Sequence, residues 1–173
     1  MRPDLGRCDH SLLRGRSGVN KLVAEPYNES RVVVTEIPQA MTAQDALVAL
    51  MIAVSASDAN IRTSELLTIQ QIVNHLPIFA EYDIDRMQQA AKTVFDLLEE
   101  EDGLDALFGL IKDAIPVSHF ETAYALACDV AAADGRLQQS ELEMLQEVRY
   151  ELAIDRLHAA AIERGARARH LPL

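Results

Sequence analysis

The chain has 173 residues and a formal net charge of −11, and 49% of its residues are hydrophobic and 25% charged. These proportions are typical of a soluble globular protein, and the scarcity of aromatic residues (5%) beside many Ala, Leu and Glu favours helices. The negative charge lies in residues 37–155, which hold six basic and 21 acidic residues. Such a surface repels nucleic acid, so we expect no nucleic-acid partner. We expect instead a protein partner, either basic or associated with a membrane.

The sequence also indicates in which cellular compartment the protein resides. No apolar run approaches the roughly 20 residues that cross a bilayer, and the N-terminus has no continuous apolar segment of a secretory signal. The chain has two cysteines, Cys8 and Cys128, in unrelated surroundings, which does not indicate a disulfide framework. We therefore expect a protein that does not span a membrane and resides in the cytoplasm.

Residues 1–40 are predicted to be a poorly ordered extension, because Gly, Pro and mixed charges leave no sustained periodicity. Residues 31–37 could form one short strand, but no other stretch offers it a partner. Met41 stands just before the first periodic segment, and we hypothesise that the native chain starts there. The first helix is predicted over residues 42–57, with Thr42 as N-cap, Asp45 in the first turn and an apolar stripe from Ala46 to Val54.

Apolar residues at helical spacing continue to the C-terminus. They predict an all-α fold, a compact bundle of about seven helices. Leu66, Leu142 and Leu157 are expected to face the core, and Ser140 with Glu143 is expected to form a capping box. Residues 164–173 are predicted to be a frayed basic tail. The helices after the first are expected near 63–76, 83–100, 104–115, 118–133, 140–152 and 154–164.

Two stretches repeat each other at a constant offset of 76 residues: SASDANIRTSEL at 55–66 and AAADGRLQQSEL at 131–142. Each reads as a helix end, a short polar turn and a helix start. The bundle is therefore expected to contain an internal pseudo-twofold repeat. Among the identical residues that the offset aligns are Asp58 with Asp134, Glu65 with Glu141, and Leu66 with Leu142.

The acidic residues of the repeated turns allow two interpretations. Asp134 follows a helix end, where the dipole disfavours a carboxylate by about 0.3–1 kcal/mol, so something must compensate. Its carboxylate could accept backbone N–H groups of the turn, with Gly135 in the left-handed conformation, which would make the turn a structural clip. Alternatively, the carboxylates could converge on a hard divalent cation, although the full Ca²⁺-loop spacing is absent. The candidate metal ligands are Asp134 and Glu141 in the second turn, and Asp58 and Glu65 in the first.

The segments VSASDANIRTSEL and VAAADGRLQQSELEML resemble the tellurite-resistance TerB family and the wider TerB-like domains. The resemblance covers residues 41–163, which leaves residues 1–40 and 164–173 outside the domain. It implies a compact all-α domain with an internal repeat and an acidic surface. It also implies a role in tellurite resistance or a related stress response, through binding rather than catalysis, with divalent cations suspected at the acidic turns. The first copy departs from the pattern, since Ala59 replaces the Gly of A-D-G.

No arrangement typical of an enzyme accompanies these turns. The sequence contains no metal-binding pair of histidines at helical spacing, no Gly-rich phosphate loop and no nucleophile with a matched base. We therefore expect a non-enzymatic binding protein with no cofactor beyond a divalent cation. The alternative is a structural adaptor between proteins, in which both turns are clips and no metal binds.

Overall fold

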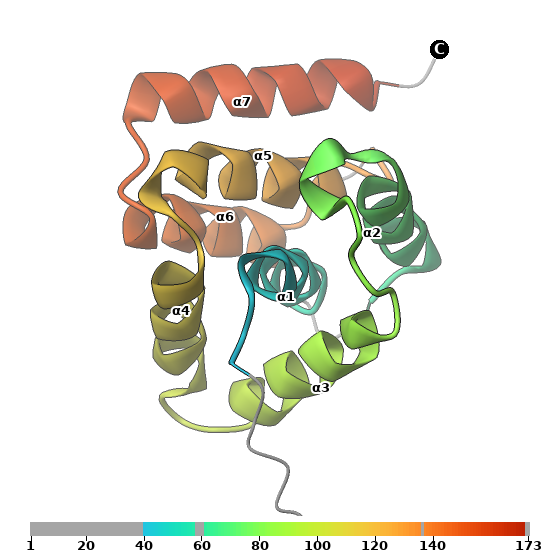
Figure 1. Ribbon diagram of the computed structural model, residues 1–173. Helices are drawn as coiled ribbons and strands as arrows, with labels where there is room; N and C mark the ends of the chain where they lie inside the picture. Colours follow the sequence, from blue (N-terminus) through green and yellow to red (C-terminus); the bar gives the residue numbers. More distant parts are fainter. Residues whose placement is uncertain (1–39, 58–60, 136, 172–173) are drawn as a thin grey trace, which may run out of the picture. The chain divides into compact units, whose positions relative to one another are not determined.

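The computed structural model describes residues 40–57, 61–135 and 137–171, and within them it contains seven α-helices and no strand (Figure 1). This confirms the predicted all-α bundle of about seven helices. The predicted extension and the strand at residues 31–37 lie outside the described residues. Within the described residues, no helix is long and apolar enough to cross a membrane. The helices are α1 (Ala43–Ser55), α2 (Thr63–His75), α3 (Arg86–Leu98), α4 (Gly103–Ala114), α5 (Phe120–Ala131), α6 (Gln139–Glu151) and α7 (Arg156–Arg169), with 3₁₀ turns at Pro77–Phe79 (η1) and Val117–His119 (η2).

Helix α1 lies in the centre of the helical domain, and every residue from Asp45 to Ser55 is buried (Figure 1). The sequence predicted an apolar stripe, but α1 is apolar on all sides, and a helix of that kind must be covered all round. Five helices supply the cover, since α2, α3, α4, α5 and α6 all contact α1. Thr42 and Asp45 cap its N-terminus reciprocally, as predicted: the Thr42 Oγ1 accepts the Asp45 N–H at 3.1 Å, and Asp45 Oδ2 accepts the Thr42 N–H at 2.9 Å.

Asp45 also anchors α3 to α1. Its side chain is 8% exposed, and the Arg86 Nε donates to Asp45 Oδ1 at 2.9 Å. Burial alone would raise the pKa of Asp45, but the hydrogen bonds from Arg86 and Thr42 outweigh burial and hold the pKa at about 2. The carboxylate that caps α1 is therefore ionised and paired within the domain.

The helices that flank the two repeated turns have matching bounds. Helices α2 and α6 begin at residues 63 and 139 and end at residues 75 and 151, while α1 and α5 end at residues 55 and 131. Each of these pairs differs by the 76 residues of the sequence repeat. A pseudo-twofold relation between the hairpins α1–α2 and α5–α6 in space stays a prediction.

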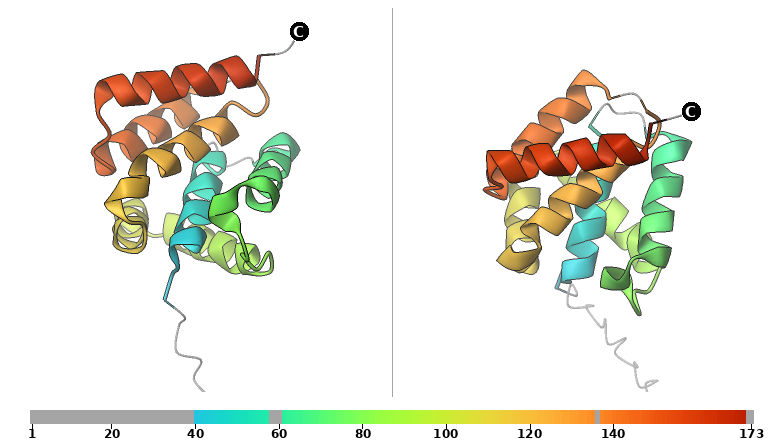
Figure 2. Two further views of the ribbon diagram at one scale, coloured as in Figure 1. Left: turned by 45° about the horizontal axis from the view of Figure 1, so that its top comes forward. Right: turned by 90° about the horizontal axis from the view of Figure 1, so that it is seen from above.

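The C-terminal helix is longer than predicted. Helix α7 lies against α5 and runs to Arg169, past the expected end near Arg164 (Figure 2). Two contacts explain the added turn: Ala166 is buried, and the Arg169 Nη2 donates to Asp129 Oδ1 on α5 at 2.5 Å. Arg167 and Arg169 also sit in the last turn, where the helix dipole favours cations.

Leu66, Leu142 and Leu157 were expected in the core but are exposed, and 80% of the surface of Leu157 is accessible. The inward face of α7 is formed by small residues such as Ala159 and Ala166, which lets α7 approach α5 closely without Leu157. The expected capping box at Ser140 is also wrong, because α6 begins at Gln139.

Replacing Asp45 by Asn should lower the free energy of unfolding at pH 7 by about 2 kcal/mol, the value of a pKa of about 2 against the usual 3.8. Because the pKa is lower in the folded state, this stabilisation is present above about pH 4 and is lost as the pH falls toward 2. Urea denaturation of both proteins across that range measures it. The control is Asp96→Asn, which breaks an exposed pair with Lys92 and should cost less than about 1 kcal/mol. An Asp45→Asn deficit that stays constant down to pH 2 would contradict the assignment.

Candidate functional site

The turn between α5 and α6 brings Asp134 out of the helical path. The Gly135 N–H donates to the carbonyl of Ala132 at 3.0 Å, and Gly135 has a φ of 72°. This is the left-handed conformation that Gly adopts without steric cost, as the sequence predicted. The tight turn leaves the Asp134 side chain, 20% of which is exposed, beside the N-terminus of α6.

Glu65 and Glu141 occupy the same position in α2 and α6, the third residue of each helix. Each carboxylate accepts a backbone N–H just before its own helix: Glu141 from Gln138 at 2.7 Å, and Glu65 from Arg62 at 3.3 Å. The positive end of the helix dipole favours a carboxylate at this position. Both residues are almost completely buried, with exposed fractions of 2% for Glu65 and 1% for Glu141. A buried carboxylate needs a nearby positive group as well as hydrogen bonds.

Arg62 supplies that positive group for both turns. Its Nη1 lies 2.6 Å from Asp134 Oδ2, 3.4 Å from Glu141 Oε1 and 3.4 Å from Glu65 Oε1. We call these four residues the Arg62 cluster. One guanidinium thus joins three carboxylates that come from both copies of the repeated motif. The structure brings together three of the four predicted ligands, and the fourth, Asp58, lies outside the described residues.

Arg62 was not predicted as a site residue from the sequence. The repeat offset aligns it with Gln138, so it is a basic residue in one copy where the other copy has a neutral amide. That asymmetry was the available signal, because an Arg next to matched acidic positions is a natural partner for them. The reach of the side chain from one hairpin to the other is a tertiary contact that residue spacing does not predict.

The Arg62 cluster contains the oxygen donors of a hard-cation site together with the guanidinium of Arg62. Carboxylate oxygens are the donors that Ca²⁺ and Mg²⁺ prefer. However, among residues 40–57, 61–135 and 137–171, no group of three or more His, Cys, Asp or Glu side chains is arranged to hold a metal ion. The guanidinium of Arg62 lies between the carboxylates. The carboxylate oxygens are of a type that binds metal ions, but they are arranged around the guanidinium.

The Arg62 cluster should show strong energetic coupling between its members. Arg62→Gln leaves buried carboxylates without their shared cation, and we expect a loss of about 3 kcal/mol in the free energy of unfolding. Combining it with Asp134→Asn should cost at least about 1 kcal/mol less than the sum of the two single changes. Urea denaturation of the double-mutant cycle measures this coupling.

The matched control combines Arg62→Gln with Asp129→Asn, which removes a carboxylate of the Arg169 pair outside the cluster. We expect these two changes to be additive within about 0.5 kcal/mol. A cycle with Asp134 that is equally additive would show that Arg62 does not stabilise the turns through this contact.

The family model for tellurite resistance protein TerB matches residues 44–164 of the chain. That range covers more than half of the sequence and includes both repeated turns and the whole Arg62 cluster. No curated protein and no solved structure gave a significant match. The family match agrees with the resemblance carried by the repeated turns. The chain therefore belongs to the tellurite-resistance TerB family.

Proposed function

We propose that this protein acts in tellurite resistance or a related metal-stress response by binding rather than by catalysis, and that the Arg62 cluster responds to divalent cations. The observation that supports this proposal is the position of Arg62, whose guanidinium lies within 3.4 Å of three carboxylates from two turns. The cluster thus concentrates negative charge around one positive group. A hard cation would compete with Arg62 for the same oxygens.

The ligands in this proposal are Asp134, Glu141 and Glu65, with Asp58 as the fourth residue inferred from the repeat. Asp134 is the entry point, because its side chain is part-exposed while Glu65 and Glu141 are almost fully buried. Binding at this position would change which group links the hairpin α1–α2 to the hairpin α5–α6. A cation could in this way alter the surface that the acidic domain offers to a basic or membrane-associated protein partner. We propose that the protein acts in the cytoplasm.

A second candidate is a structural adaptor without a metal site, in which the Arg62 cluster only fastens the two turns. The exposed Leu66 and Leu142 favour it, because each follows the buried Glu of its motif and presents apolar surface to solvent. Apolar side chains exposed at the same position in both copies offer contact surface to another protein. This candidate predicts that the cluster contributes stability and that no cation changes it.

Thermal melts with chelator, Ca²⁺ or Mg²⁺ distinguish the two candidates. A cation that binds the folded state raises the melting temperature by mass action. Competition with Arg62 predicts a larger rise in Arg62→Gln than in the unchanged protein, because Arg62 then no longer competes with the ion for the carboxylate oxygens. Arg62→Gln is a suitable variant because Gln occupies the aligned position, 138, in the second copy. Asp134→Asn with Glu141→Gln should abolish the rise in both backgrounds.

The control is Lys92→Gln, which removes a positive charge from an exposed pair outside the cluster and should leave the cation response unchanged. If neither cation raises the melting temperature of the unchanged protein or of Arg62→Gln, the cation proposal fails and the adaptor remains. An equal rise in all variants would indicate nonspecific binding to the acidic surface and would also overturn it.

A further inference from the structure

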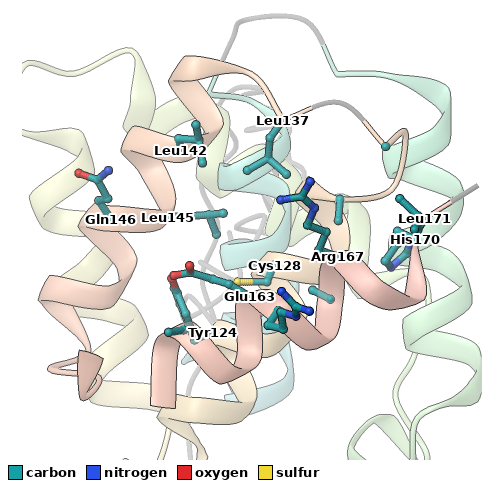
Figure 3. A pocket seen from close by; sticks show the side chains of 15 residues that line it. Tyr124, Cys128, Leu137, Leu142, Leu145, Gln146, Glu163, Arg167, His170 and Leu171 are labelled. Atoms are coloured by element: carbon teal, nitrogen blue, oxygen red, sulfur yellow. The ribbon is translucent and has the colours of Figure 1, made fainter. Parts of the chain in front are cut away.

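A pocket of about 660 Å³ opens between α5, α6 and α7, beside the turn that joins α5 to α6 (Figure 3). Small-molecule sites in proteins commonly have volumes of about 300–1,000 Å³. The residue types explain the space, because the helices meet here through small side chains: Ala132, Gly135, Ala160 and Ala166 all line the pocket. None of the four residues of the Arg62 cluster lines it.

One wall of the pocket is apolar and only partly covered. Leu145 of α6 is buried, whereas Leu142 is 39% exposed and Leu137 of the turn is 45% exposed. Figure 3 shows these three side chains on the same side of the pocket. Placing an apolar group against them would remove hydrophobic surface from water, which is favourable.

The opposite part of the lining is polar and is formed by Tyr124, Cys128 and the Glu163 carboxylate. Burial raises the pKa of the Cys128 thiol to about 12, and the carboxylate of Glu163 adds to that rise. The Tyr124 hydroxyl donates to Glu163 Oε1 at 2.6 Å, and burial and this hydrogen bond both raise the pKa of Tyr124. Both groups are therefore neutral at physiological pH. The Glu163 carboxylate is held by Tyr124.

Positive charge lies at the rim, on α7. Arg164 and Arg167 both line the pocket, and neither forms an ion pair with another residue that the structure describes. Their neighbour Arg169, by contrast, pairs with Asp129 at 2.5 Å. In Figure 3 the Arg167 side chain extends toward Leu137, so a guanidinium lies next to the apolar wall. The two guanidinium groups place positive charge at the pocket in a chain with a net charge of −11.

We propose that this pocket binds an amphiphile with an apolar chain and one anionic head group, a carboxylate or a phosphate. The chain lies against Leu137, Leu142 and Leu145, and the head group accepts hydrogen bonds from Arg164 and Arg167. Guanidinium groups match the geometry of both anions. The proposal goes beyond the cation-responsive turns and does not depend on them.

Calorimetric titration of the full chain with decanoate, decyl phosphate and decanol, each below its micelle concentration, tests the proposal. Both anions should bind at least about tenfold more tightly than the neutral alcohol, since hydrogen bonds to charged groups are the stronger ones. The stronger of the two anions identifies the head group. Replacing Arg164 and Arg167 by Gln should remove this advantage and leave decanol binding unchanged.

Two variants on α7 are matched controls. Arg156→Gln removes the same charge from the same helix, at a residue that does not line the pocket, and should leave decanoate binding unchanged. Ala160→Met fills the pocket and should weaken all three ligands, whereas Ala168→Met, also exposed on α7 but outside the pocket, should not. Melting temperatures verify that each variant is folded.

Three results would overturn the proposal. The first is equal affinity for decanol and decanoate, and the second is an equal loss in Arg156→Gln and in the Arg164/Arg167 variant. The third is decanoate binding that weakens as the protein concentration rises, which would show that a second copy of the chain fills the pocket.

Discussion

The burial of α1 from Asp45 to Ser55 is the constraint on which the rest of the domain depends. A helix with no polar face cannot lie at a surface, so α2, α3, α4, α5 and α6 must all pack against it. The polar chemistry is then confined to the two ends of α1. At its N-terminus the buried Asp45 caps the helix and pairs with Arg86 of α3. At its C-terminus the chain enters the first repeated turn and reaches Arg62. Both charged contacts thus lie where a wholly apolar helix meets the polar groups of its neighbours.

The Arg62 cluster compensates for the buried carboxylates that the repeated motif places in the domain. Each copy places a carboxylate at the third position of a helix, where it satisfies a backbone N–H and interacts well with the helix dipole. The same position is buried, and a buried charge is costly unless a counter-charge accompanies it. Two copies with Gln at both aligned positions would bring two such carboxylates together without this guanidinium. Arg62, present in one copy only, offsets the cost for both. The difference between the copies is therefore as important to the domain as their similarity.

Much of the fold could be predicted from residue spacing, because apolar periodicity reports which side of a helix is covered. Helix bounds near Thr63 and Gln139, the left-handed Gly135 and the acid-rich turns follow from local patterns. The errors arise where tertiary contacts rotate or extend a helix. Glu65 and Glu141 take the buried positions, which turns the next residues, Leu66 and Leu142, outward. The last turn of α7 depends on contacts with α5, and the pairing of Arg62 depends on which hairpins meet. None of these contacts is encoded in spacing along the chain.

The acidic and the apolar side chains of the turn between α5 and α6 and of the start of α6 contact different parts of the domain. Asp134 contacts Arg62 and belongs to the contact between hairpins, whereas Leu137 and Leu142 line the pocket against α7. Gly135 permits this division, because its positive φ bends the chain sharply between the acidic and the apolar residues. The first copy has Ala59 at the aligned position and is followed by α3, not by a basic helix such as α7. The residues that line the pocket come from α5, the turn and helix of the second copy, α7 and the residues just after α7. The second hairpin thus owes its pocket to the sharp bend at Gly135 and to α7, which packs against α5 beside that bend.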